Sequence, residues 1–291
     1  MLGGRTLLDA VVSRLGQDDN VNSVVLFGSQ ARDPGLPVAS DGWSDIDLHV
    51  IVADVGAFAA PSNLETLGPK PPKLHVNRNA SGGVRKVTLL YDDAEVDLVV
   101  IPRWQMQLAR MGLALGCQER IVPLRTALNE MSTIMRGGYR FLKGEATWGK
   151  FYADVVAKLP GQRWGDAEVR AAADAFLCDY LWVLQKLARG ELIAAQRSLH
   201  LQLADANYRL MHELRLRQGR PTFREARRLE KLLAAGEREM LQVSARLAAP
   251  ELQAAADKAL ATMKILVGEL LPGWSPPADY SAMVGRVIIS N

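Results

Sequence analysis

Residues 24–52 read VVLFGSQARDPGLPVASDGWSDIDLHVIV, and this stretch decides the fold that the sequence predicts. Its first apolar run ends at Gly28, which is typical of a buried strand closed by a turn. After a loop, SDIDLHVIV alternates polar and apolar residues and then becomes wholly apolar, which predicts a second strand. Because residues i and i+2 of a strand share one face, Asp45 and Asp47 should point the same way, with the apolar residues between and after them on the other face.

Two neighbouring carboxylates of this kind repel each other. At a separation of roughly 4 Å the repulsion costs about 1 kcal/mol in water and about 4 kcal/mol at an effective dielectric constant of 20. Unless one of them is protonated, the pair is best explained by a shared cation, and hard oxygen ligands suit Mg²⁺. The Gly28–Ser29 turn adds a backbone N–H without an obstructing Cβ and one hydroxyl, which are the groups that a polyphosphate needs beside a metal.

Gly28-Ser29 followed by Asp45-Ile46-Asp47 resembles the DNA polymerase β-like nucleotidyltransferase superfamily. The signature of that superfamily is a glycine-serine turn, an Asp-x-Asp strand and a third acidic residue on a neighbouring strand. An isolated DxD has little meaning, but the whole string LFGSQAR…SDIDLHVI is far more specific. The sixteen residues from Ser29 to Asp45 exceed the usual spacing of the family, and we attribute the difference to a loop insertion over Asp33–Gly42.

The third acid is expected on a predicted hairpin formed by Val84–Tyr91 and Ala94–Ile101. Asp97 matches the family pattern, and Glu95 on the same strand face is the alternative. The resemblance implies transfer of a nucleoside monophosphate from ATP or another nucleoside triphosphate to an acceptor hydroxyl. Asp45, Asp47 and Asp97 would then bind two Mg²⁺ ions, with Asp97 on the ion nearest the attacking oxygen. Gly28 and Ser29 would hold the β- and γ-phosphates, and Arg32 is near enough in sequence to help.

The remaining chain predicts an α+β protein in which a mixed-sheet catalytic domain, 1–105, is followed by a helical bundle domain, 106–291. A loop-rich excursion covers Ala53–Pro72, and strand signals nearly vanish after Gln118. The expected helices are Thr6–Leu15, Ile121–Arg136, Phe151–Leu159, Asp166–Arg189, Glu191–Leu216, Thr222–Leu247 and Glu251–Leu271, and the tail Ser281–Ile289 could be a strand or a helix.

Within the helical part, Trp182, Lys186 and Arg189-Gly190-Glu191 form a run similar to one in antibiotic adenylyltransferases of the streptomycin and lincosamide types. This resemblance implies that Lys186 helps to bind the nucleotide and that a carboxylate of the helical domain removes the acceptor proton. Asp179 is the residue we assign to that role, with Asp174 and Glu191 as alternatives. The run is equally explained by a packed tryptophan, a lysine lying along it and the end of a helix.

The distribution of charge along the chain bears on which class of acceptor the protein uses. Residues 1–105 contain 9 Lys and Arg against 13 Asp and Glu, whereas residues 106–291 contain 26 against 19. The basic half leaves open a nucleotidyltransferase that acts on RNA, or on a protein partner in a toxin–antitoxin pair. A non-enzymatic nucleotide-binding module is disfavoured by the complete set of three acids. We expect a small-molecule hydroxyl acceptor, with an antibiotic among those considered, and little binding of nucleic acid.

The amino-acid composition also indicates the cellular compartment in which we expect the protein. The chain is 48% hydrophobic and 23% charged, which describes a soluble protein with an ample core. No apolar run approaches the ~18 residues of a membrane helix, and Cys117 and Cys178 match no motif spacing. We therefore expect a cytoplasmic protein without disulfides.

Overall fold

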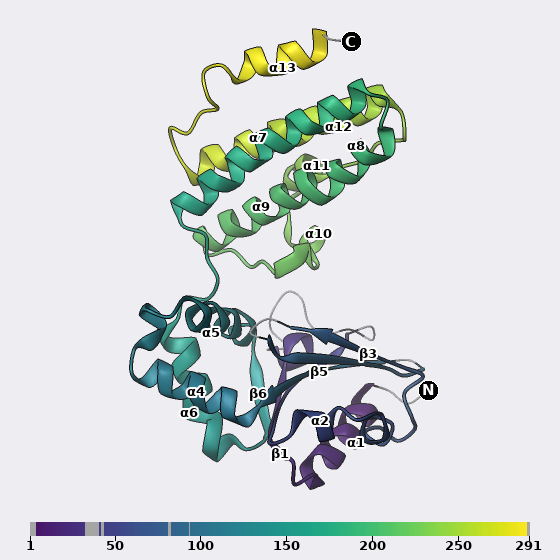
Figure 1. The fold of residues 1–291 in the computed structure, drawn as a ribbon, viewed down its shortest axis with the longest axis vertical. Helices are drawn as coiled ribbons and strands as arrows, with labels where there is room; N and C mark the ends of the chain where they lie inside the picture. Colours follow the sequence, from purple (N-terminus) through teal and green to yellow (C-terminus); the bar gives the residue numbers. More distant parts are fainter. Residues whose placement is uncertain (1–3, 33–40, 42–43, 81–82, 93, 290–291) are drawn as a thin grey trace. The chain divides into compact units, whose positions relative to one another are not determined.

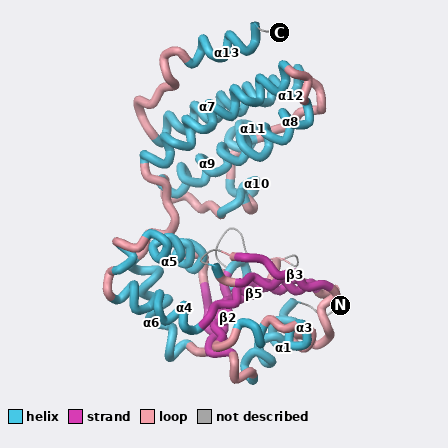
Figure 2. Tube along the Cα trace, viewed as in Figure 1, coloured by secondary structure: helices cyan, strands magenta, loops and turns pink. Residues whose placement is uncertain are grey.

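The computed structural model describes residues 4–32, 41, 44–80, 83–92 and 94–289. It divides into two compact units, Met1–Gln162 and Arg163–Asn291. The first contains a sheet with helices, and the second is helical (Figures 1 and 2), so the predicted α+β class is confirmed. The expected loop insertion over 33–42 lies outside the described residues except for Asp41.

The sheet of the first unit is mixed, with strand order β3-β4-β5-β2-β1-β6. Strands β2 and β5 are parallel, and the other neighbouring pairs are antiparallel. The predicted hairpin is present as β4 and β5. The sequence did not predict the two edge strands, β3 and β6, because both are short and neither is strongly apolar. The strands are β1 (Val21–Phe27), β2 (Ile46–Val52), β3 (Leu74–Asn79), β4 (Arg85–Leu90), β5 (Glu95–Pro102) and β6 (Tyr139–Lys143).

Helices cover both faces of this sheet. On one face, α1, α2 and α3 pack on the side chains that include Ile46 and Leu48. On the other, α4, α5 and α6 pack on Phe27, Ile51 and Ile101. Asp47 and Asp97 belong to this second face, because they alternate with the first set along their strands. The helices are α1 (Gly4–Gln17), α2 (Val55–Phe58), α3 (Pro61–Leu64), α4 (Arg103–Ala114), α5 (Val122–Met135) and α6 (Glu145–Lys158).

The boundary between the two units lies at Gln162, not at the predicted position 105. Strand β6 pairs with β1, and α4, α5 and α6 bury their apolar faces against the sheet. These segments follow the acidic strands in sequence but share their core. The disappearance of strand signals after Gln118 therefore did not mark a domain boundary.

The second unit packs its helices around a single apolar core that includes Phe176, Leu210 and Met263. A π-helical turn, Leu199–Ala204, joins α8 to α9, so the predicted helix over Glu191–Leu216 is nearly continuous. The predicted helix over Thr222–Leu247 is wrong: Glu225, Ala226 and Arg228 have positive φ and leave only short helices there. The helices are α7 (Asp166–Ala188), α8 (Leu192–Ser198), α9 (Asp205–Arg217), α10 (Leu229–Leu232), α11 (Ala235–Leu241), α12 (Ala249–Leu270) and, in the tail, α13 (Tyr280–Ile289).

Two further expectations concern the chain as a whole. Both cysteines are free thiols. Among the described residues, the helices are all too short or too polar to span a membrane.

Candidate active site

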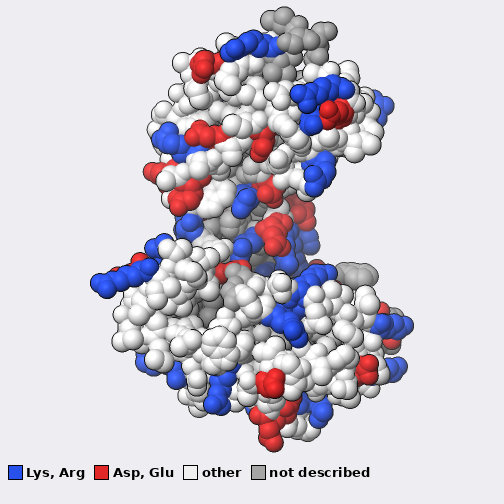
Figure 3. Space-filling view, viewed as in Figure 1, with Lys and Arg blue, Asp and Glu red and all other residues white. Residues whose placement is uncertain are grey.

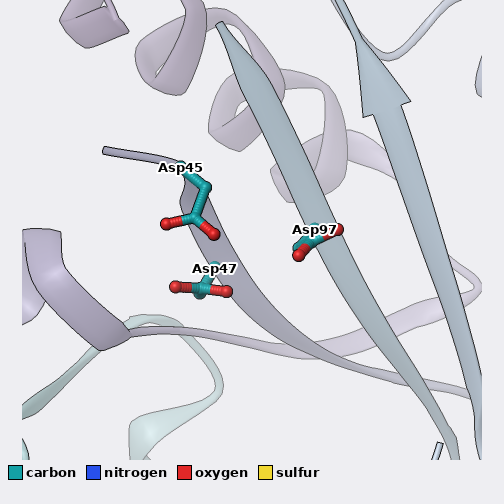
Figure 4. A group of neighbouring side chains, drawn as sticks. All are labelled: Asp45, Asp47 and Asp97. Carbon is teal, nitrogen blue, oxygen red and sulfur yellow. The ribbon is translucent and has the colours of Figure 1, made fainter. Parts of the chain in front are cut away.

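The three predicted acids lie together at one end of β2 and β5. Asp45 directly precedes β2, Asp47 is its second residue, and Asp97 lies opposite Asp47 on the parallel neighbour β5. Figure 4 shows Asp45 at the start of β2, Asp47 on that strand and Asp97 beside them on the neighbouring strand. One carboxylate oxygen from each lies within 4.8 Å of the others. Asp47 and Asp97 are buried, and Asp45 is half-buried. Oxygen ligands at this spacing suit a hard divalent cation.

Asp97 is held by two side chains of β4 that sequence reasoning missed. Thr88 lies opposite Asp97 in the β4–β5 register and donates its hydroxyl proton to Oδ1 at 2.5 Å. Lys86 places Nζ 2.5 Å from Oδ2, and its side chain is 30% exposed. The spacing of Lys86 and Thr88, i and i+2 on a predicted strand, would have placed them on one face, but not beside Asp97. One ammonium therefore already offsets part of the charge of the three carboxylates.

The turn after β1 fits the phosphate-binding role that the resemblance implies. Gly28 has φ +75°, and a Cβ at this position would overlap Oδ2 of Asp47. Only glycine gives the backbone this conformation and this approach without strain. The Ser29 hydroxyl is buried and has no hydrogen-bond partner in the described chain. Gln30 donates to the Ser44 carbonyl at 3.2 Å, which ties the turn to the residue before Asp45. An unsatisfied buried hydroxyl beside an acid cluster fits a polar ligand such as a metal-bound phosphate.

A buried histidine lies two residues after Asp47 on the same strand face. The Nδ1 atom of His49 is 3.3 Å from the Tyr152 hydroxyl, and its ring packs edge-on against Phe27. Burial lowers the pKa of His49 to about 4, so the ring is neutral at pH 7. The alternation that identified the two aspartates also places His49 on their face, but the sequence alone gave no reason to single it out.

Glu95, the alternative third acid, lies near the site, and its surroundings disfavour its charged form. Burial raises its pKa first, and the negative charges of Asp97 and Asp45 raise it further. Asp97 rather than Glu95 belongs to the three-carboxylate cluster. Arg32 follows the turn that starts at Gly28, and its role toward phosphate stays a prediction.

The site residues predicted in the helical part lie in the second unit. Burial raises the pKa of Asp179 on α7. Lys186 lies over the Trp182 ring, 4.9 Å from its centre, and pairs with Glu191 at 2.6 Å beyond the end of α7. These contacts of Lys186 match the interpretation of the Trp182–Glu191 run as a packed tryptophan with a lysine lying along it at the end of a helix. The roles of Asp179 and Lys186 toward substrate stay predictions.

No protein-family model matches the sequence, and no curated protein does. A solved structure described as an aminoglycoside 6-adenyltransferase from Bacillus subtilis is similar at 15% identity, with 97% of each chain covered and a TM-score of 0.42. A nucleotidyltransferase-like protein from Exiguobacterium sibiricum is similar at 12% identity, with 99% of this chain and 78% of the other covered and a TM-score of 0.33. At these identities and TM-scores the likenesses assign no activity to this chain.

Proposed function

We propose that this protein is a Mg²⁺-dependent nucleotidyltransferase that moves a nucleoside monophosphate, with ATP as the expected donor, onto a hydroxyl of a small molecule. The observation that carries the proposal is the convergence of three carboxylates from two parallel strands, with oxygens within 4.8 Å, beside the glycine-serine turn. Each part alone is common in proteins. Their combination is what an in-line transfer at a phosphate requires, since such reactions depend on positioning and charge neutralisation.

Each residue of the site then has a distinct task. Asp45, Asp47 and Asp97 would hold Mg²⁺, two ions by the family resemblance, which supplies Lewis-acid stabilisation of the phosphoryl oxygens. Gly28 lets the backbone approach the β- and γ-phosphates, and the buried Ser29 hydroxyl gains a partner there. The acceptor hydroxyl attacks the α-phosphorus, and pyrophosphate leaves. Thr88 fixes the orientation of the Asp97 carboxylate on the acceptor side.

The acceptor-side residues come from the resemblance to antibiotic adenylyltransferases. Asp179 would remove the acceptor proton, and burial raises the pKa of its carboxyl, which makes the carboxylate a stronger base. Lys186 would contact the nucleotide, for which it must leave its ion pair with Glu191. An antibiotic therefore belongs in any panel of acceptors.

An RNA acceptor is the second candidate, because residues 106–291 are basic overall. In the second unit, however, positive and negative side chains are interspersed on the face shown in Figure 3. If RNA were the acceptor, its affinity would fall with salt with a log–log slope of about −0.7 per phosphate contacted. We expect RNA binding to be weak at physiological salt. A protein acceptor, as in toxin–antitoxin pairs, would use the same acids.

The test of the proposed function uses α-phosphate-labelled ATP, Mg²⁺ and a panel of hydroxyl compounds that includes streptomycin, a lincosamide and RNA. The wild-type protein should transfer label to a small molecule, and Asp47→Asn should transfer none while keeping its fold. Circular dichroism checks the fold of the variant. Wild-type turnover in both Asp45→Asn and Asp47→Asn would show that the proposed function is wrong.

A further inference from the structure

A cavity next to the three acids suggests what kind of acceptor the protein takes. We propose that this cavity, between the sheet and helices α4 and α5, binds the acceptor and that the acceptor carries a neutral apolar or aromatic ring near its reactive hydroxyl. The proposal rests on the proposed function and narrows it. It separates this protein from enzymes whose acceptors are polycations.

The cavity has a volume of about 150 Å³ and lies wholly within the first unit. Its floor includes Val99 of β5, and its walls include Ala109 of α4 with Ala127 and Ile134 of α5. Val99 is half-buried although β5 is an interior strand of the sheet. The helices therefore do not seal this part of the sheet, and solvent reaches the floor. An apolar cavity of about this volume accepts a single benzene-sized ring.

The position of the cavity points to the acceptor. Its residues His49 and Val99 come two positions after Asp47 and Asp97 on the same strand face. At about 3.3 Å per residue, the floor begins roughly 7 Å from the acids. Strand β1 is antiparallel to β2 with Phe27 opposite Asp47, so the Gly28–Ser29 turn that follows β1 lies toward Asp45, at the other end of the acids from His49. The phosphates at the turn and a ring in the cavity would thus lie on opposite sides of the acids, as donor and acceptor must for in-line attack.

The chemistry of the walls selects against charged acceptors. Most of the lining side chains are apolar, and Glu130 is the one carboxylate among the described lining residues. Glu130 can pair with one ammonium group, but desolvating each further ammonium group without a partner costs several kcal/mol, so the lining selects against a molecule with many amines. A neutral ring gains free energy in the same place, because it buries apolar surface.

The experiment fills the cavity from two independent helices. Ala109→Leu and Ala127→Leu each add a bulky side chain to a wall, whereas Ala114→Leu adds the same atoms to an exposed position of α4 and is the matched control. The probe is 2-phenylethanol, which has one ring and one hydroxyl. Its binding and that of Mg²⁺–ATP are measured by calorimetry, with thermal melts to verify folding.

We expect 2-phenylethanol to bind the wild type and Ala114→Leu equally, and both filled variants at least about tenfold more weakly, with the Kd of Mg²⁺–ATP unchanged in all four. Absence of probe binding to the wild type would overturn the proposal. So would a comparable loss of Mg²⁺–ATP affinity in the filled variants, which would assign the cavity to the nucleobase. Streptomycin binding that is lost on filling would refute the selection against polycations.

Failure of the proposed function gives a different pattern. If the probe binds and filling abolishes its binding, but no acceptor receives label from ATP, the cavity is a ligand site and the transferase proposal is wrong. If label is transferred and filling changes neither acceptor KM nor probe binding, the transferase stands and the cavity proposal is wrong.

Discussion

Replacing Lys86 by methionine should tighten divalent metal binding, because this lysine and a metal ion compete for the charge of Asp97. The ammonium lies 2.5 Å from Oδ2 of Asp97, so a cation shared by the three acids must bind close to it. Methionine keeps much of the length and apolar stem of lysine and removes only the charge. The variant therefore isolates electrostatic competition from packing.

The size of the effect follows from Coulomb's law. An ammonium and a dication separated by roughly 5 Å repel by about 2 kcal/mol in water and about 7 kcal/mol at an effective dielectric constant of 20. Because the Lys86 side chain is 30% exposed, solvent screens the pair and we take the lower figure. That corresponds to a Kd more than about tenfold lower in the variant.

The assay is a titration with Mn²⁺ in the absence of nucleotide. The concentration of free Mn²⁺ is measured by electron paramagnetic resonance. Lys73→Met is the matched control, since Lys73 also lies 2.5 Å from an aspartate, Asp92, but away from the three acids. Its Mn²⁺ affinity should equal that of the wild type. Without metal, Lys86→Met should melt at a lower temperature, because buried Asp97 loses its counter-charge, and Mn²⁺ should restore the melting temperature. A Kd for Mn²⁺ within twofold of wild type in Lys86→Met would refute the competition.

Three further outcomes test the site. Asp97→Asn should lower kcat by orders of magnitude with little change in nucleotide Kd, because the proposed function places Asp97 on the metal ion nearest the acceptor. Equal losses in steady-state kinetics and nucleotide binding would show that Asp97 also holds the ion that binds the triphosphate. Gly28→Ala should lower the free energy of unfolding by about 1–3 kcal/mol in urea titrations, since the new Cβ meets Asp47 and the φ of +75° is strained; unchanged stability would contradict the close approach. His49 has a folded pKa of about 4 against an ordinary value of 6.5, so between these pH values it binds fewer protons in the folded than in the unfolded state. Its contribution to the free energy of unfolding should therefore be fully present above pH 6.5 and fall by about 3 kcal/mol as the pH drops to 4. His49→Gln should remove that part of the pH dependence, and an identical pH profile for the variant would show that His49 does not cause it.

The sequence by itself determined the local conformation around the acids. The alternation after Ser44 places Asp45 and Asp47 on one face, and Ile46 between them is buried on the other. The turn between Val84–Tyr91 and Ala94–Ile101 likewise fixed the β4–β5 hairpin. These features are encoded within about ten residues, where the side-chain period of a strand and the turn chemistry act directly. The resemblance to a known family added Asp97, and the structure brings it to the other two acids.

Only the tertiary structure decided which segments lie side by side. The parallel pairing that sets Asp97 opposite Asp47 joins residues fifty positions apart, and strand periodicity says nothing about which strand becomes the neighbour. The same holds for Lys86 on Asp97, for β6 on β1 and hence the boundary at Gln162, and for the cavity under α4 and α5. A local pattern fixes the face on which a side chain lies, whereas burial of that face against distant elements fixes its partners. The charge balance of the acids and the shape of the space beside them are therefore properties of the folded chain alone.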